Sequence, residues 1–236
     1  MPGILARIRS SLKTSAGDVV FGMEDGAVSI FGLVFGVAAT TDQNAHVLVA
    51  GITGAFAAAV SMMAGVFMDR QSEKDQLRVS LEDLRALQAS DPAGVTASVE
   101  TRLVRTGLAP AAAAQLVAGV SARPGGLKAL AEATLLPPPA DGKEDSATAH
   151  ALWMLVSNLF ASLLPVLPFA LLPLADARIA SIALTTVLMF ALGVWRAKLG
   201  HRHTLSTALT TLGIAAAAGA VGLLTGQIVH AWFGAA

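Results

Sequence analysis

The sequence contains no cysteine among its 236 residues, and charged residues make up only 14% of the chain. The absence of cysteine excludes disulfides, thiolate metal sites, iron–sulfur clusters, covalent haem attachment and cysteine nucleophiles. The scarcity of charge leaves too little to cover the water-facing surface of a soluble protein of this length. Sixteen basic residues balance sixteen acidic ones, so no net charge favours nucleic acid as a partner.

Long apolar stretches dominate the chain, with 54% hydrophobic residues and a mean hydropathy of +0.65. A helix that spans a membrane needs about 20 mainly apolar residues. The stretches that meet this requirement are residues 18–40, 46–68, 151–174, 179–195 and 205–232. We therefore expect an all-α integral membrane protein with a bundle of five spanning helices in the lipid bilayer.

Residues 69–150 differ in composition, because they hold nine of the basic and eleven of the acidic residues. We expect a water-exposed helical insert between the second and third spans. Its first helix continues out of the second span, since leucines recur at helical spacing up to residue 89. Ser90, Asp91 and Pro92 form the start signal of a second helix that ends at Gly107. Two more helices follow, and residues 135–146 form a linker.

Lysine and arginine collect on the cytoplasmic side of membrane proteins. With five spans, fifteen of the sixteen basic residues fall on one side, and only Arg178 falls on the other. This predicts a cytoplasmic N-terminal arm (1–17), spans 1–2 (18–68), a cytoplasmic insert (69–150) and spans 3–5 (151–236). The high alanine content and short outer turns favour a bacterial inner (plasma) membrane.

Two acidic residues, Glu24 and Asp25, lie in the first span, where a charge costs a few kcal/mol or more. A carboxylate buried there can bind a cation or carry a proton. Asp25 begins a stripe of small and polar residues that a second helix can approach closely: Asp25, Ser29, Gly32 and Gly36. Alternatively, both acids lie at the membrane interface, hydrated or paired with Lys13 or Arg9.

The second span carries small residues along one seam, at Gly51, Gly54, Ala58, Ser61 and Gly65. Met62 borders this seam, and its thioether is a soft ligand suited to a transition metal such as Fe²⁺. The alternative is that Met62 only fills the core.

In the third span, Asn158 precedes Pro165, Pro168 and Pro173, which must kink or interrupt the helix. Either the freed carbonyls line a cavity, or the prolines merely shape the bundle.

Acidic residues of the insert, including Glu73, Glu82 and Glu132, would concentrate divalent cations near a pore mouth. The alternative is a solvated helix stabilised by the spacings Arg78 to Glu82 and Glu82 to Arg85. The chain has no HExxH, no GxxxxGK and no nucleophile elbow. We therefore expect neither an enzyme nor a bound cofactor.

Three segments in this order resemble the vacuolar iron transporter family over nearly the whole chain: GMEDGAVSIFGLVFGVAAT, AGITGAFAAAVSMMAGVFMDRQSEKD and SLLPVLPFALLP. The resemblance implies a homodimeric carrier that moves Fe²⁺, and in many relatives Mn²⁺, out of the cytoplasm in exchange for protons. The pore would lie between the paired first helices. By the resemblance, Asp25 and Met62 are the membrane ligands, and Glu132 belongs to the cytoplasmic metal-binding domain.

The chain also departs from the family pattern. Gly54 stands where strong iron transporters have a glutamate, so one candidate ligand is missing, and Glu24 partly replaces its charge. Ser80, Leu84 and Leu87 stand near the positions of the glutamates on the plant members' cytoplasmic helix. These losses leave open a second hypothesis, a non-transporting membrane metal sensor or scaffold that acts through the insert. A third is a transporter of another divalent metal.

Overall fold

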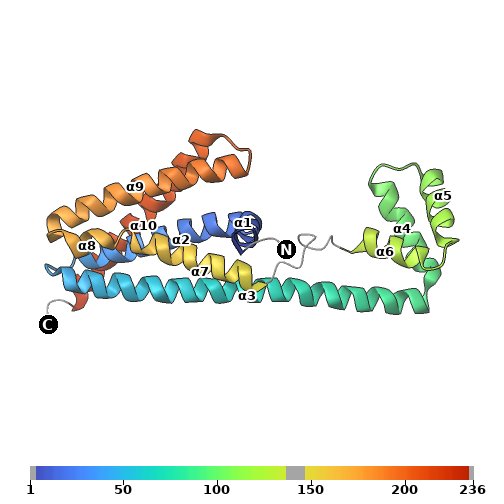
Figure 1. The fold of residues 1–236 in the computed structure, drawn as a ribbon, viewed down its shortest axis with the longest axis horizontal. Coiled ribbons are helices and arrows are strands. Elements are labelled where there is room, and N and C mark those ends of the chain that lie inside the picture. The colour runs from blue at the N-terminus through green and yellow to red at the C-terminus, as the bar shows by residue number, and fades with distance from the viewer. Residues whose placement is uncertain (1–3, 137–146, 234–236) are drawn as a thin grey trace. The chain divides into compact units, whose positions relative to one another are not determined.

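The computed structural model describes residues 4–136 and 147–233, and every regular element in those ranges is a helix (Figure 1). In chain order the helices are α1 (Ile4–Thr14), α2 (Ala16–Ala38), α3 (Asn44–Ser90), α4 (Pro92–Arg105), α5 (Pro110–Ser121), α6 (Gly126–Leu135), α7 (Ala147–Leu163), α8 (Leu167–Leu171), α9 (Leu174–Leu199) and α10 (Thr204–Phe233). The expected all-α class is confirmed. The linker 135–146 lies mostly outside the described residues.

Four of the described helices are long and apolar enough to cross a membrane: α2, α3, α9 and α10. The expected third span is instead divided into α7, of 17 residues, and the short α8. The break falls at Pro165, which has no N–H to donate to the helix. The Pro165 carbonyl accepts a hydrogen bond from Ser181 Oγ of α9 at 2.8 Å. Asn44 Nδ2 of α3 donates to the carbonyls of Phe169 and Leu172, at 2.9 and 2.7 Å. These carbonyls therefore already accept hydrogen bonds from side chains of the same chain.

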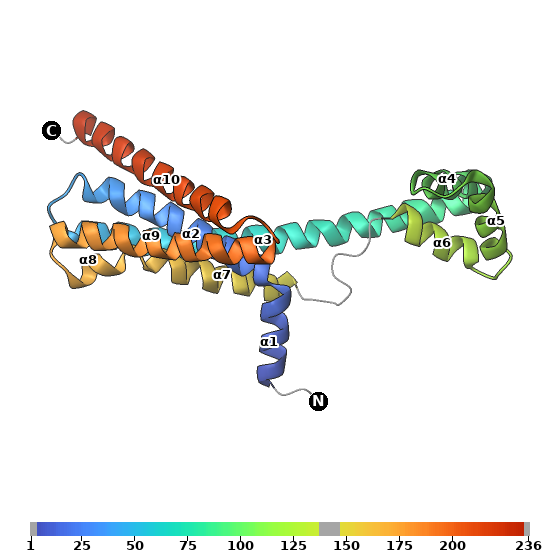
Figure 2. The same cartoon turned by 90° about the horizontal axis from the view of Figure 1, so that it is seen from above.

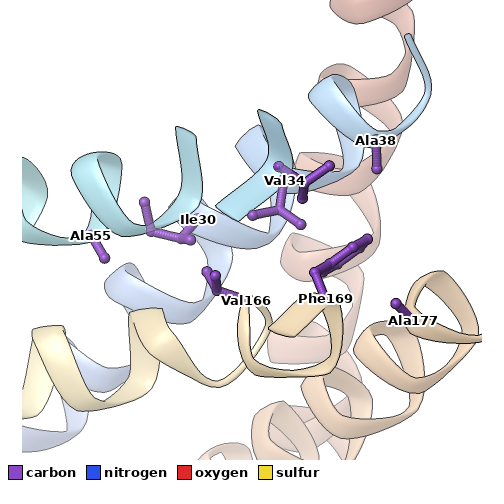
Figure 3. Packing of buried hydrophobic residues seen from close by; sticks show 8 residues of the cluster. Ile30, Val34, Ala38, Ala55, Val166, Phe169 and Ala177 are labelled. Atoms are coloured by element: carbon purple, nitrogen blue, oxygen red, sulfur yellow. The ribbon is translucent and has the colours of Figure 1, made fainter. Parts of the chain in front are cut away.

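The chain divides into two compact units, one made of residues 1–68 and 145–236 and the other of residues 69–144. In the first unit α2 is central and packs against α7, α9 and α10. Figure 3 shows one of its core clusters, in which Val34 of α2 faces Phe169 of α8. A second cluster joins Ala27 of α2 to Met189 and Leu192 of α9.

Glycines let the helices of the first unit approach closely, but not in the way that the stripe on the first span suggests. A Cβ on Gly32 would come within 2.9 Å of the Ala218 carbonyl oxygen, and one on Gly36 within 2.6 Å of the Gly222 carbonyl oxygen. Both glycines therefore face α10 of the same chain. Gly26, outside the expected stripe, meets α7 instead, where a Cβ would come 2.6 Å from Ser162 Oγ.

The second unit consists of α4, α5 and α6 packed on the last turns of α3. Its core contains Leu84, Val95, Val99, Val117 and Ala131. Asp91 caps α4 by accepting a hydrogen bond from the Gly94 N–H at 2.8 Å, and Pro92 follows at the first helical position. Gly107 adopts the positive φ of 103° that ends a helix well. The helix start expected at Pro92 is confirmed.

Candidate functional site

Glu24 and Asp25 are adjacent on α2 but point to different neighbours. Glu24 is buried, and its Oε2 accepts a hydrogen bond from Arg196 Nη1 of α9 at 3.0 Å. This ion pair offsets the free-energy cost of burying a carboxylate in an apolar helix. The sequence suggested Lys13 or Arg9 as the basic partner, whereas the partner that the structure gives Glu24 comes from the far end of α9.

Asp25 is partly exposed and is held by α7. Asn158 Nδ2 donates to Asp25 Oδ2 at 3.2 Å, and Ser162 Oγ donates to Asn158 Oδ1 at 3.3 Å. Asn158 and Ser162 are fully buried, so the two hydrogen bonds form a fixed polar chain behind the carboxylate. Asn158 therefore sets the position of Asp25 while one side of the carboxylate stays open.

Asp25 lies in the middle of the open face of α2, which we define as Gly17, Phe21, Asp25, Ser29 and Leu33. These residues follow one another at four-residue intervals, which places them along one side of the helix. Phe21 is 54% exposed and Leu33 39%, and Gly17 and Ser29 are also exposed. The other faces of α2 are covered by α3, α7, α9 and α10. The open face thus carries one carboxylate and one hydroxyl in an otherwise apolar strip.

Met62 lies on α3 in the same unit as Asp25 and is half-buried. Gly54, about two turns earlier, is also half-buried, and a Cβ there would come 2.6 Å from the Leu33 side chain of the open face. In the expected seam on α3, Gly51 and Gly54 pack closely against side chains of other helices. At Ser61 and Gly65 it is exposed, and a Cβ on Gly65 would meet nothing within 4 Å.

The candidate acids of the second unit each lie beside an arginine. Arg78 Nε donates to Glu82 at 3.0 Å, Arg70 Nη1 lies 3.4 Å from Glu73, and Arg85 Nε lies 3.9 Å from Glu132. The hydrogen bond to Glu82 and its negative charge raise the pKa of Arg78. The expected Arg78–Glu82 pair is present, but Arg85 lies beside Glu132 of α6. These carboxylates are therefore already balanced by positive charge.

No group of three or more histidine, aspartate or glutamate side chains that could hold a metal ion occurs in residues 4–136 and 147–233. Glu24 and Asp25 have different hydrogen-bond partners, and Met62 lies on another helix, α3. Glu73, Glu82 and Glu132 belong to the second unit. A single copy of the described chain thus offers only separate ligands for a divalent ion.

A further polar cluster was not expected from the sequence. His150 Nδ1 of α7 lies 2.5 Å from Asp18 Oδ2 and 3.3 Å from Ser15 Oγ. His150 and Ser15 are buried, so this cluster joins the start of α7 to the start of α2. His150 was placed at the end of the insert, because a histidine next to an apolar stretch looks like its hydrophilic border. Only its contacts with Asp18 and Ser15 show that His150 belongs to the helix bundle.

Comparison with known proteins gives a consistent result over most of the chain. The chain is 26% identical over 215 residues to vacuolar iron transporter 1 of Arabidopsis thaliana, covering 90% of this chain and 85% of that protein. It is 27% identical over 210 residues to vacuolar iron transporter 1 of Oryza sativa subsp. japonica, covering 87% and 82%. The family model described as the VIT family matches residues 16–227. This match runs from the first residue of α2 into the last turns of α10, and the chain therefore belongs to the VIT family.

Proposed function

We propose that this membrane protein exports divalent iron or manganese from the cytoplasm in exchange for protons, as a homodimer. The observation that carries the proposal is the position of Asp25, a carboxylate held by Asn158 in the middle of the open face of α2. The relatives that bear the name vacuolar iron transporter support iron as the substrate. Manganese as a substrate is what the resemblance to the family implies, and proton exchange follows from the cost of an ionised carboxylate in the membrane.

Exchange follows from the cost of an ionised carboxylate in a low-dielectric site. Such a group is stabilised when a cation or a proton neutralises it. When the metal ion leaves Asp25, a proton takes its place, and the next metal ion displaces that proton. The thioether of Met62 would favour a transition metal over Mg²⁺ or Ca²⁺, which prefer oxygen ligands.

A second copy of the chain completes the site. Metal ions need more ligands than one carboxylate and one thioether, and in the described part of one chain no larger acidic cluster is present. Two copies that face each other across the open face of α2 would supply two Asp25 and two Met62 side chains. They would also cover Phe21 and Leu33, which one chain leaves exposed.

The alternative, a metal sensor or scaffold that acts through the insert, has less support. Glu73, Glu82 and Glu132 lie beside Arg70, Arg78 and Arg85, and an adjacent positive charge disfavours a bound cation.

We also propose that the N-terminus and the insert lie in the cytoplasm and that the membrane is a bacterial plasma membrane. The basic residues of the first unit, except Arg178, lie near the end where α2 begins and α9 ends.

The test is metal-dependent proton flux in proteoliposomes with the Asp25→Asn variant. This change keeps the shape of the side chain and an acceptor for Asn158 but removes the charge. We expect loss of both Fe²⁺ or Mn²⁺ transport and the coupled proton flux. Asp42→Asn, in the exposed turn after α2, is the matched control and should transport normally. Undiminished transport by Asp25→Asn contradicts the proposal.

A cell assay separates transport from sensing. Cells that overproduce an exporter should tolerate excess Mn²⁺ or Fe²⁺ and should contain less of that metal. Unchanged metal content would instead support the sensor.

A further inference from the structure

The helix α1 runs across the end of α2 instead of continuing it (Figure 2). Residues 4–14 of the expected N-terminal arm form this helix. One residue, Ser15, separates α1 from α2. Since α2 spans the membrane, α1 must stay at the membrane surface, because one residue cannot carry it away.

The turn between α1 and α2 is fixed by α7. Trp153 Nε1 donates to Ser11 Oγ of α1 at 3.1 Å. Ser15 is buried, and its Oγ lies 3.3 Å from His150 Nδ1. These contacts hold the direction in which α1 leaves the bundle, so the helix presents the same side to its surroundings.

One side of α1 is apolar, and its residues Ile8 and Leu12 are exposed. Its sequence ILARIRSSLKT carries aliphatic residues at positions 4, 5, 8 and 12, which is the spacing of an amphipathic helix. Ile8 is 47% exposed and Leu12 38%. Ser11, which α7 holds, lies about 100° around the helix from Leu12 and borders the strip about 60° from Ile8. The apolar strip is therefore open at Ile8 and Leu12.

The surface around α1 is basic. The helix has no acidic residue, and Arg9 and Lys13 are exposed. At the same end of the unit, α9 and the turn after it add Arg196, Lys198 and Arg202, all exposed. Of the nearby acids, Glu24 pairs with Arg196, which leaves Arg9, Lys13, Lys198 and Arg202 as basic residues, and Asp18 lies beside His150. The end of the unit that carries α1 therefore has a net positive charge.

We infer that α1 is an interfacial helix that binds anionic lipid. Ile8 and Leu12 insert at the boundary between head groups and acyl chains, and Arg9 and Lys13 bind lipid phosphates. An apolar strip flanked by basic residues is the pattern of helices that lie in a membrane surface. The bilayer is the occupant because α2 places α1 beside it. This role goes beyond metal transport and does not depend on it.

The chain lacks cysteine, so single cysteines can report where each side of α1 lies. We would attach an environment-sensitive fluorophore to Ile8→Cys and, as the matched position on another side, to the exposed Ser10→Cys. Both variants of the full chain are reconstituted into phosphatidylcholine vesicles with and without phosphatidylglycerol. Nitroxide-labelled lipid should quench the label at position 8, and aqueous iodide should quench the label at position 10.

Recognition of anionic lipid is tested in the same vesicles. Removing a basic residue with Arg9→Gln or Lys13→Gln should lower the ratio of immersed to water-accessible label at position 8, on the order of fivefold for each charge. Lys128→Gln, in the second unit, should have no effect. Equal iodide quenching at positions 8 and 10 would overturn the proposal. Immersion that is the same without phosphatidylglycerol and in both variants would overturn the binding of anionic lipid.

Discussion

At the scale of single residues, Glu24 and Asp25 show how one helix assigns different roles to two adjacent acids. Glu24 is buried against Arg196, whereas Asp25 stays partly exposed and accepts from Asn158. The guanidinium of Arg196 balances the charge of Glu24, whereas the neutral side chains of Asn158 and Ser29 leave the charge of Asp25 in place. Asp25 is therefore the carboxylate of the pair that remains available to a cation.

Asn158 should act on transport through Asp25. In Asn158→Leu the carboxylate loses a donor worth about 1 kcal/mol, or more when a charged group accepts. We expect the initial rate of Mn²⁺ uptake into proteoliposomes to fall about tenfold at equal protein. Ser162→Ala, which removes the hydrogen bond behind Asn158 but keeps the one to Asp25, should stay within about threefold of the parent. A parental rate in Asn158→Leu would refute this positioning role.

Met62 should affect which metal is carried more than how well the protein folds. Replacing methionine by leucine conserves volume and usually costs less than about 1.5 kcal/mol, but it removes the sulfur. In Met62→Leu we expect a weaker preference for Fe²⁺ and Mn²⁺ over Mg²⁺, measured by competition for uptake. Met63→Leu is the control on the next position of α3. If both variants keep the parental preference, Met62 serves only in packing.

At the scale of helices, the contact between α2 and α10 is made by backbone against backbone. A Cβ on Gly222 would collide with the carbonyl oxygen of Gly32, which cannot rotate away as a side chain can. Gly222→Ala should therefore destabilise the first unit by about 1–3 kcal/mol, seen as a lower melting temperature in detergent. Gly213→Ala, on the same helix with nothing within 4 Å, should be neutral or slightly stabilising. Equal melting temperatures would show that the helices can separate at no cost.

The sequence predicts helices better than it predicts their partners. Hydropathy located α2, α3, α9 and α10 because a bilayer demands a long apolar run. The start of α4 was predictable because Asp91 and Pro92 satisfy a helix N-terminus locally. In contrast, the pattern of Gly32 and Gly36 shows only that a helix comes close, not whether it belongs to the same chain. The partner of Glu24 depends on how α9 packs, which local spacing does not contain.

At the scale of the whole molecule, the proposed homodimer is a prediction about the open face of α2. Ser29 is exposed on that face, about one turn from Asp25. In the cysteine-free background, Ser29→Cys should form a disulfide between two copies under mild oxidation, since bridged residues need Cα atoms about 4.4–6.8 Å apart. The readout is a dimer band on a non-reducing gel.

The control for this cross-link is Val221→Cys, which is exposed on α10. It should stay monomeric under the same oxidation. Cross-linking at position 221 without cross-linking at position 29 would place the contact between copies on a different surface and leave Asp25 facing lipid.

The glycine contacts of α2 also limit how an ion can pass. Because α7 and α10 contact the backbone of α2 directly, α2 cannot move closer to either helix. Asp25 therefore keeps its position in the unit. Alternating access from the two sides of the membrane then requires movement of the element that faces Asp25. In the proposed homodimer, each copy would then act as the moving gate of the other.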